Sequence, residues 1–175
     1  MIQFLALTVI GKYDPALPER LTGVIAEAGC NIRESRITIL GQEFSMLLLL
    51  AGNWNAVVKV EDALARLGQE QDLSVSMRRT ELDKAEKNLM PYAIDVVCSD
   101  RVGVVNRITR FILDNGIQIR DLSTTTYEAS HTGTEMFSLH LTIHVPVEIS
   151  ISSLRNDFLE FCDQLNLDAI IEPVK

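Results

Sequence analysis

The chain has 175 residues, of which 47% are hydrophobic and 23% are charged, so it can bury a packed core and is not an intrinsically disordered protein. Its 24 acidic residues outnumber its 16 lysines and arginines, and the net charge of −8 has the wrong sign for a surface that attracts phosphates. Direct binding of nucleic acid is therefore not expected.

The N-terminal stretch 1–11 is apolar, but it has neither a basic leader nor a small-residue cleavage site, so it predicts a strand and not a signal peptide or a membrane span. The three cysteines, Cys30, Cys98 and Cys162, are widely spaced and odd in number. This pattern favours buried thiols in a reducing compartment over a disulfide framework or a metal site. We expect a cytoplasmic protein with no metal and no other cofactor.

Apolar periodicity predicts the same order of elements twice along the chain. In the first half it predicts a strand, a helix, two strands, a helix and a strand, at residues 5–10, 17–28, 32–40, 44–50, 55–67 and 73–77. The second half repeats this order with strands at 92–97, 119–127, 135–145 and 168–171, and with helices that begin near residues 104 and 152. The turn after residue 127 is about six residues longer than its counterpart at Gly41-Gln42.

An internal repeat supports this duplication. Residues 21–34 align with residues 108–121, so that Gly29 falls on Gly116 at an offset of 87 residues. We therefore predict an α+β fold made of two tandem ferredoxin-like βαββαβ domains, each an antiparallel four-stranded sheet with both helices on one face. The predicted limits are 1–79 for domain 1, 80–90 for a charged linker and 91–175 for domain 2.

The loop between the first strand and the first helix of each repeat has the chemistry to bind a small zwitterion. In the second repeat Asp100 can take an ammonium group, while the helix that starts after Gly103 presents backbone N–H groups to a carboxylate. The first repeat has Asp14 in this loop, but it lacks the glycine and places Pro18 near the helix start. The alternative is that Asp100 only caps the helix and Gly103 only relieves crowding.

Two histidines, His140 and His144, are four residues apart, a spacing that on a helix would suggest a pair of metal ligands. The residues around them alternate between polar and apolar, however, which is strand periodicity. At about 3.3 Å per residue the imidazoles lie about 13 Å apart, too far to share an ion. We therefore predict that both belong to a polar sheet face and that the chain has no metal site. No catalytic motif is present, so no catalytic residue and no enzyme activity are predicted.

The corresponding strand of the first repeat differs in polarity. Leu47 and Leu49 occupy the positions of His140 and Thr142, so this strand is apolar on both faces. We expect another surface to cover it, because a large exposed apolar patch is a liability. A second subunit of a homodimer, the other repeat or a different protein are the candidates. Trp54 lies between two asparagines, and we expect Asn53 or Asn55 to cap a helix beside a packed Trp54.

The residues 100–105, D-R-V-G-V-V, resemble the D-R-x-G-x-V signature of the ACT domain, a βαββαβ module that senses amino acids. The stretches 30–37, 40–45 and 51–57 are similar to two-ACT transcriptional repressors. In ACT modules the ligand usually lies at an interface between copies, against this loop and the polar residue just after the helix-ending glycine. By position, the resemblance implies a ligand site made of Asp100, Arg101, Val102, Gly103 and Val104, with Gln118, Asn31 and Asp14.

The resemblance also implies a function and partners. It implies repression of glycine cleavage genes by contact with a DNA-bound LysR-type activator, with glycine, a small amino acid, relieving that contact. An acidic chain without a DNA-reading element is compatible with such indirect action. Two alternatives stay open at this point: a regulatory subunit that senses an amino acid and controls a metabolic enzyme, and a structural adaptor that binds no ligand.

Overall fold

The computed structural model describes residues 1–82, 88–130 and 132–174. The chain divides into two compact units, Met1–Lys84 and Ala85–Lys175. Of the predicted linker at 80–90, residues 83–87 lie outside the described part of the chain. The strands on either side of it extend further than expected, since one ends at Thr80 and the next begins at Leu89. The exact limits of the two domains therefore stay a prediction.

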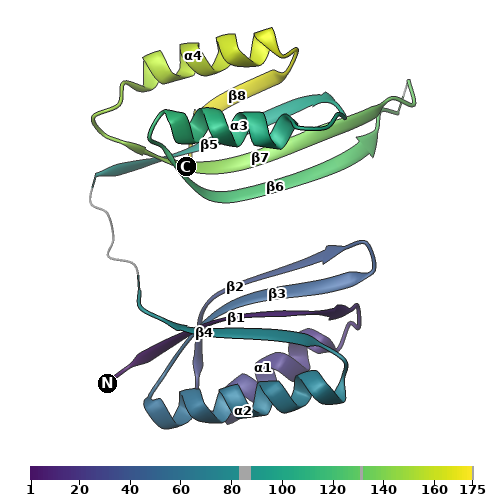
Figure 1. Cartoon of the computed structure of the whole chain (residues 1–175), viewed down its shortest axis with the longest axis vertical. Helices are drawn as coiled ribbons and strands as arrows, with labels where there is room; N and C mark the ends of the chain where they lie inside the picture. Colours follow the sequence, from purple (N-terminus) through teal and green to yellow (C-terminus); the bar gives the residue numbers. More distant parts are fainter. Residues whose placement is uncertain (83–87, 131, 175) are drawn as a thin grey trace. The chain divides into compact units, whose positions relative to one another are not determined.

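Unit 1 has the predicted order of elements, and both helices cover the same face of its sheet (Figure 1). The strands follow the spatial order β2-β3-β1-β4, and every pair is antiparallel. This is the ferredoxin-like arrangement. The elements are β1 (Gln3–Lys12), α1 (Leu17–Glu27), β2 (Asn31–Leu40), β3 (Glu43–Gly52), α2 (Trp54–Glu70) and β4 (Ser74–Thr80).

Unit 2 repeats this architecture, again with both helices on one face of the sheet (Figure 1). Its strands follow the order β6-β7-β5-β8 and are antiparallel throughout. The two-domain ferredoxin-like fold predicted from the repeat is confirmed. The elements are β5 (Leu89–Ser99), α3 (Val104–Asp114), β6 (Gln118–Glu128), β7 (Glu135–Pro146), α4 (Ile151–Gln164) and β8 (Asp168–Pro173).

Each unit has its own apolar core between sheet and helices. In β1 the buried residues alternate with half-buried ones, as expected for a strand with one covered face, and Leu5, Leu7 and Val9 point towards the helices. Leu21 of α1 and Leu64 of α2 pack against them, and both are fully buried. Among the residues that the structure describes, no polar or charged residue is fully buried. Burial of apolar side chains therefore dominates the stability of each unit.

The helix ends show how glycine and asparagine shape the units. Gly29 and Gly116 adopt φ angles of +83° and +70°, the left-handed conformation that ends a helix and that glycine adopts without steric cost. The N-cap of α2 is Asn53, whose Oδ1 accepts a hydrogen bond from the backbone N–H of Ala56 at 2.9 Å. Trp54, which was expected to be packed, is instead 57% exposed, because it begins the helix on the side away from the core.

Both units contain a β-bulge at the same place, between the second and the fourth residue of the second strand. The pairing of β2 with β3 shifts between Ile32 and Glu34, and the pairing of β6 with β7 shifts between Ile119 and Asp121. The extra residue shifts the alternation of side chains between the two faces of the sheet by one position. Because of it, Ile32 and Ile37 lie on the same face of the sheet, although they are five residues apart and a regular strand would point them to opposite faces.

The sheet faces that no helix covers differ between the units. In unit 1 Leu47 is 53% exposed on this open face, with Leu49 on the same strand partly exposed, as the alternating pattern predicts. In unit 2 the open face is polar, and Nδ1 of His140 lies 2.7 Å from Oδ1 of Asp95. His140 therefore pairs with a carboxylate on the neighbouring strand β5. No group of three or more side chains that could hold a metal ion occurs in the described residues.

The three cysteines are free and buried in the cores, as expected. Burial raises the pKa of Cys162 to about 12 and also raises the pKa of Cys30 and of Cys98, so all three are protonated at neutral pH. Within the described residues, none of the helices combines the length and the apolar character that crossing a membrane requires.

Candidate functional site

The predicted ligand loop of unit 2 connects β5 to α3, at residues 100–103. The backbone N–H of Asp100 donates to the carbonyl of Glu135 at 3.0 Å, which fixes the start of the loop to the first residue of β7. Gly103 is the N-cap residue of α3 and has φ +92°, a conformation that a side chain would strain. Asp100 therefore does not cap the helix, and its carboxylate is exposed to solvent.

The N-terminus of α3 has no side-chain cap. The first backbone N–H groups of a helix have no partner within the helix, and they carry part of the positive end of the helix dipole. Val104, the first helical residue, is 5% exposed and anchors this turn in the core. The loop thus places uncapped N–H donors and the Asp100 carboxylate within one short segment, which is the pair of groups that a zwitterion needs.

Two other residues of this loop take different roles. Arg101 donates a hydrogen bond from its guanidinium group to the backbone carbonyl of Leu165, the C-cap residue of α4. Its side chain therefore ties the loop to the negative end of another helix. Val102 is fully exposed at 103%, so it contributes nothing to the core of its own unit. Of the predicted loop residues, Asp100 and Gly103 remain those with the chemistry to hold a ligand.

The predicted residues after the helices lie at the opposite end of each sheet. Gln118 begins β6 and pairs through His144 with Pro91, eight residues along β5 from Ser99. At about 3.3 Å per residue this separates Gln118 from the loop by about 26 Å along the strand. In unit 1, Asn31 is placed in the same way relative to Asp14, since it begins β2 and pairs through Ala51 with Phe4. Neither unit by itself brings its loop and its post-helix residue together.

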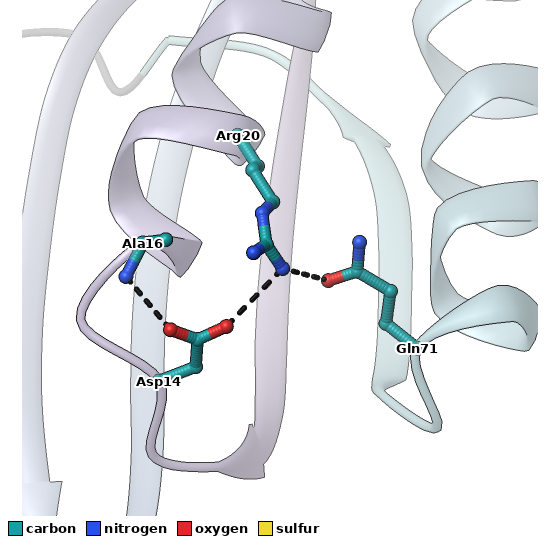
Figure 2. A network of polar contacts seen from close by, with 4 residues as sticks. All are labelled: Asp14, Ala16, Arg20 and Gln71. Atoms are coloured by element: carbon teal, nitrogen blue, oxygen red, sulfur yellow. Dashed lines mark hydrogen bonds and ion pairs between the residues drawn. The ribbon is translucent and has the colours of Figure 1, made fainter.

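The equivalent loop of unit 1 contains a network of polar contacts (Figure 2). Asp14 accepts a hydrogen bond on Oδ1 from the backbone N–H of Ala16 at 3.0 Å, and its Oδ2 lies 3.1 Å from Nη1 of Arg20. The same nitrogen of Arg20 donates to Oε1 of Gln71 at 3.1 Å. The network joins the β1–α1 loop to the end of α2, and Asp14 is held from both sides.

Sequence reasoning found Asp14 but missed Arg20 and Gln71. Arg20 lies on α1, whose apolar periodicity gives no information about polar partners, and Gln71 is 51 residues further along the chain. A single sequence gives no signal that links two polar residues over such a separation. Only the folded corner, where the C-terminal end of α2 meets the start of α1, brings them into contact.

Comparison with known proteins connects this architecture to a family. The ACT domain family model matches residues 3–78, which make up most of unit 1. The glycine cleavage system transcriptional repressors of Escherichia coli K12 and Shigella flexneri are each 28% identical to this chain over 171 residues, covering 98% of it and 90% of their own length. These relatives are regulators of transcription.

Solved structures agree over the whole chain. A crystal structure assigned provisionally as a glycine cleavage system transcriptional repressor has a TM-score of 0.75 and 26% identity, and covers 100% of this chain and 99% of its own. A protein of unknown function from Galdieria sulphuraria has a TM-score of 0.80 with 20% identity over all of both chains, which shows a shared fold. Residues 3–78 thus match the ACT domain family, and the chain as a whole is similar in sequence and in its two-unit fold to glycine cleavage system transcriptional repressors.

Proposed function

We propose that the protein is an amino-acid-responsive transcriptional regulator that represses glycine cleavage genes by contact with a DNA-bound LysR-type activator in the cytoplasm. The observation that carries this proposal is the similarity to glycine cleavage system transcriptional repressors, which spans 98% of the chain and therefore includes both domains. A shared single domain would support only a shared fold. Similarity over both domains supports a shared role.

The charge of the chain favours contact with a protein over contact with DNA. A net charge of −8 opposes approach to the phosphate backbone, and the only adjacent pair of basic residues is Arg78-Arg79. Arg79 is already engaged, since its guanidinium forms two hydrogen bonds with Glu61, at 3.0 and 2.8 Å. The DNA specificity of the proposed complex therefore comes from the activator.

Glycine is the proposed effector, and the β5–α3 loop of domain 2 is its proposed contact. Glycine consists of little more than an ammonium group and a carboxylate, so a site for it needs one anion, a set of N–H donors and little space. Asp100 supplies the anion and the uncapped N-terminus of α3 supplies the donors. Gln118 and Asn31 stay predicted ligand residues, which can contact a ligand at such a loop only when another domain contributes them.

A gel-shift assay tests this function. Promoter DNA of the glycine cleavage genes is mixed with the LysR-type activator, the protein is added, and millimolar glycine is then titrated in. We expect the protein to retard the activator–DNA complex further and glycine to reverse this, while the protein alone leaves free DNA unshifted. No additional retardation, or retardation that glycine does not change, would contradict the proposal.

The matched variants are Asp100→Ala and Asp114→Ala. Asp100 lies in the proposed ligand loop, whereas Asp114 is an exposed carboxylate at the far end of the same helix. Asp100→Ala is expected to keep the contact with the activator and to lose the response to glycine, and Asp114→Ala is expected to keep both. A homodimer also stays a prediction, which sedimentation velocity over a range of protein concentrations checks.

A further inference from the structure

The open face of unit 1, the side of its sheet opposite α1 and α2, is apolar along its two central strands (Figure 1). Side chains that point to this face alternate along β1 and β3 with the buried ones. The face is hollowed at Ala6, where a depression of about 510 Å³ lies beside Leu47 and Leu49. A surface of this kind is normally covered by another surface.

The two central strands place a large apolar side chain beside a small one at each level of the open face. Residues directly opposite each other on β1 and β3 form four such cross-strand pairs. The pairs are Phe4 with Ala51, Ala6 with Leu49, Thr8 with Leu47, and Ile10 with Ser45. Each level therefore has a projecting side chain next to a recess, and a second copy of the same face, turned by half a rotation, fills recesses with projections.

The two edges of the open face carry opposite charges at one of these levels. Glu34 of β2 pairs with Leu49, and Arg78 of β4 pairs with Ala6, so the two charges extend the Ala6–Leu49 pair to either side of the sheet. Three strand spacings separate them by about 14 Å. Both side chains are exposed, and neither makes an ion pair with another described residue. Each charge is thus available to a surface that packs on the sheet.

We propose that the open face of unit 1 is the interface of a homodimer, in which two copies stack face to face about a two-fold axis that runs parallel to the strands between β1 and β3. The rotation places β1 of each copy over β3 of the other, and β2 over β4. Leu49 then enters the depression at Ala6 of the second copy. At the edges, Glu34 faces Arg78 of the second copy, and this contact occurs twice because the interface is symmetric.

The area of the face is sufficient for a specific but reversible dimer. The strands β1, β2 and β3 each have ten residues, which corresponds to about 33 Å, and four strands span about 19 Å. Each copy therefore contributes about 600 Å², and the total of about 1,200 Å² is at the lower end of the range for specific interfaces. We expect an equilibrium between monomer and dimer that dilution shifts towards the monomer.

The chemistry of the face favours a second copy over a polar surface such as the open face of unit 2. At the position of Leu47, unit 2 has His140, whose imidazole contacts the Asp95 carboxylate. Packing this polar pair on leucines costs free energy, because it removes polar groups from water without replacing their hydrogen bonds. A second unit 1 offers apolar partners in the centre and opposite charges at the edges. The inference is independent of the proposed function, since it involves neither glycine nor the activator.

Charge reversal at the two edges, in two separate variants, tests the interface. Glu34→Arg and Arg78→Glu each place like charges against each other at both symmetric contacts. In sedimentation velocity of the full chain at low salt, we expect each variant alone to raise the dissociation constant of the dimer about tenfold. An equimolar mixture of the two variants is expected to dimerise as the wild type does, because both contacts of the mixed dimer again join an arginine to a glutamate.

A second pair of variants tests the apolar centre. The side chains of Leu47 and Ile37 are exposed to nearly the same extent, 53% and 51%. Leu47 lies on the open face, whereas Ile37 pairs with the buried Met46 and therefore points to the side of the helices. We expect Leu47→Lys to raise the dissociation constant more than about tenfold, and Ile37→Lys to leave it unchanged. Circular dichroism checks that both variants remain folded.

Each alternative gives a distinct result. A wild-type chain that stays monomeric up to its solubility limit overturns the proposal and means that another part of the chain or a different protein covers the face. A dimer that Ile37→Lys weakens and Leu47→Lys leaves intact also overturns it, because such a dimer pairs through the edge strand β2. A mixture that stays as dissociated as its two components contradicts the two-fold contact of Glu34 with Arg78.

Discussion

Arg101 donates to the backbone carbonyl of Leu165, so a loop at the start of α3 is tied to the end of α4. Arg101→Ala removes this charge-assisted hydrogen bond and its interaction with the helix dipole. Because the side chain is exposed, we expect unit 2 to lose about 1 kcal/mol of unfolding free energy. Urea unfolding followed by circular dichroism measures the change.

The control for this prediction is Arg107→Ala, which removes an exposed arginine of α3 whose side chain makes no hydrogen bond or ion pair with the described residues. The urea midpoint of unfolding of Arg107→Ala should equal that of the wild type within experimental error. If both variants lose the same stability, the effect is one of general charge and not of the contact with Leu165.

The N-caps of the second helix in each unit give a matched pair. Asn53 accepts a hydrogen bond from the Ala56 N–H, whereas Ser150, at the N-cap of α4, makes no cap hydrogen bond and contacts the Ser152 hydroxyl at 3.0 Å instead. Asn53→Ala is therefore expected to destabilise the chain by about 1 kcal/mol, and Ser150→Ala by clearly less. Equal losses in thermal unfolding would mean that the cap geometry does not set the difference.

Two helical glycines are expected to respond oppositely to alanine. A Cβ at Gly23 in α1 meets no atom within 4 Å, so Gly23→Ala should stabilise the chain by about 0.5–1 kcal/mol through helix propensity. A Cβ at Gly68 in α2 would lie 2.9 Å from Cγ2 of Val75 and 3.1 Å from the backbone oxygen of Leu73. Gly68→Ala should therefore destabilise by about 1–3 kcal/mol.

Chemical denaturation of the two glycine variants checks both signs at once. A stabilised Gly68→Ala would show that β4 can move away from α2 without loss, and would contradict the close packing of this helix on the strand. A destabilised Gly23→Ala would point to a contact of α1 beyond its own unit.

The Glu61–Arg79 pair predicts a dependence of stability on pH. Hydrogen bonds from Arg79 hold the pKa of Glu61 below its usual value, although burial acts in the opposite direction. A carboxyl whose pKa is lowered in the folded state stabilises the fold at neutral pH, and this contribution is lost as the pH falls through the folded pKa. The difference in stability between wild type and Glu61→Gln should thus shrink on acidification.

Asp62→Asn is the matched control, because Asp62 follows Glu61 in α2, is exposed and makes no ion pair with a described residue. Unfolding midpoints at pH 7 and at pH 3 are compared for the three proteins in low salt. A Glu61→Gln deficit that is as large at pH 3 as at pH 7 would contradict an ionic origin of the contribution.

Most of the fold could be predicted from the sequence because its determinants are local or repeated. Alternation along strands and the spacing of apolar residues along helices are visible in short windows, and the alignment of Gly29 with Gly116 shows that one unit is present twice. The two-residue turn at Gly41 and Gln42 was also predictable, and Gly41 has the positive φ that such a turn requires.

The site was less predictable because its contacts join distant parts of the chain. Asp100, Gly103 and Asp14 could be chosen from loop chemistry, but the partners of Arg101 and Arg20 are 64 and 51 residues away. Trp54 is a residue whose burial was wrongly predicted for the same reason. Its apolar ring predicts burial, yet its exposure depends on where the first turn of α2 meets the sheet, which no local pattern encodes.

The β-bulges after Ile32 and Ile119 lie 87 residues apart, the same interval that separates the helix-ending glycines. The bulge therefore belongs to the backbone plan that the two halves have in common, as the helix-ending glycines do. The halves differ in the length of the β6–β7 hairpin tip and in the residue at the corner position, Asp14 in one and Arg101 in the other. One scaffold thus carries two different sets of corner residues.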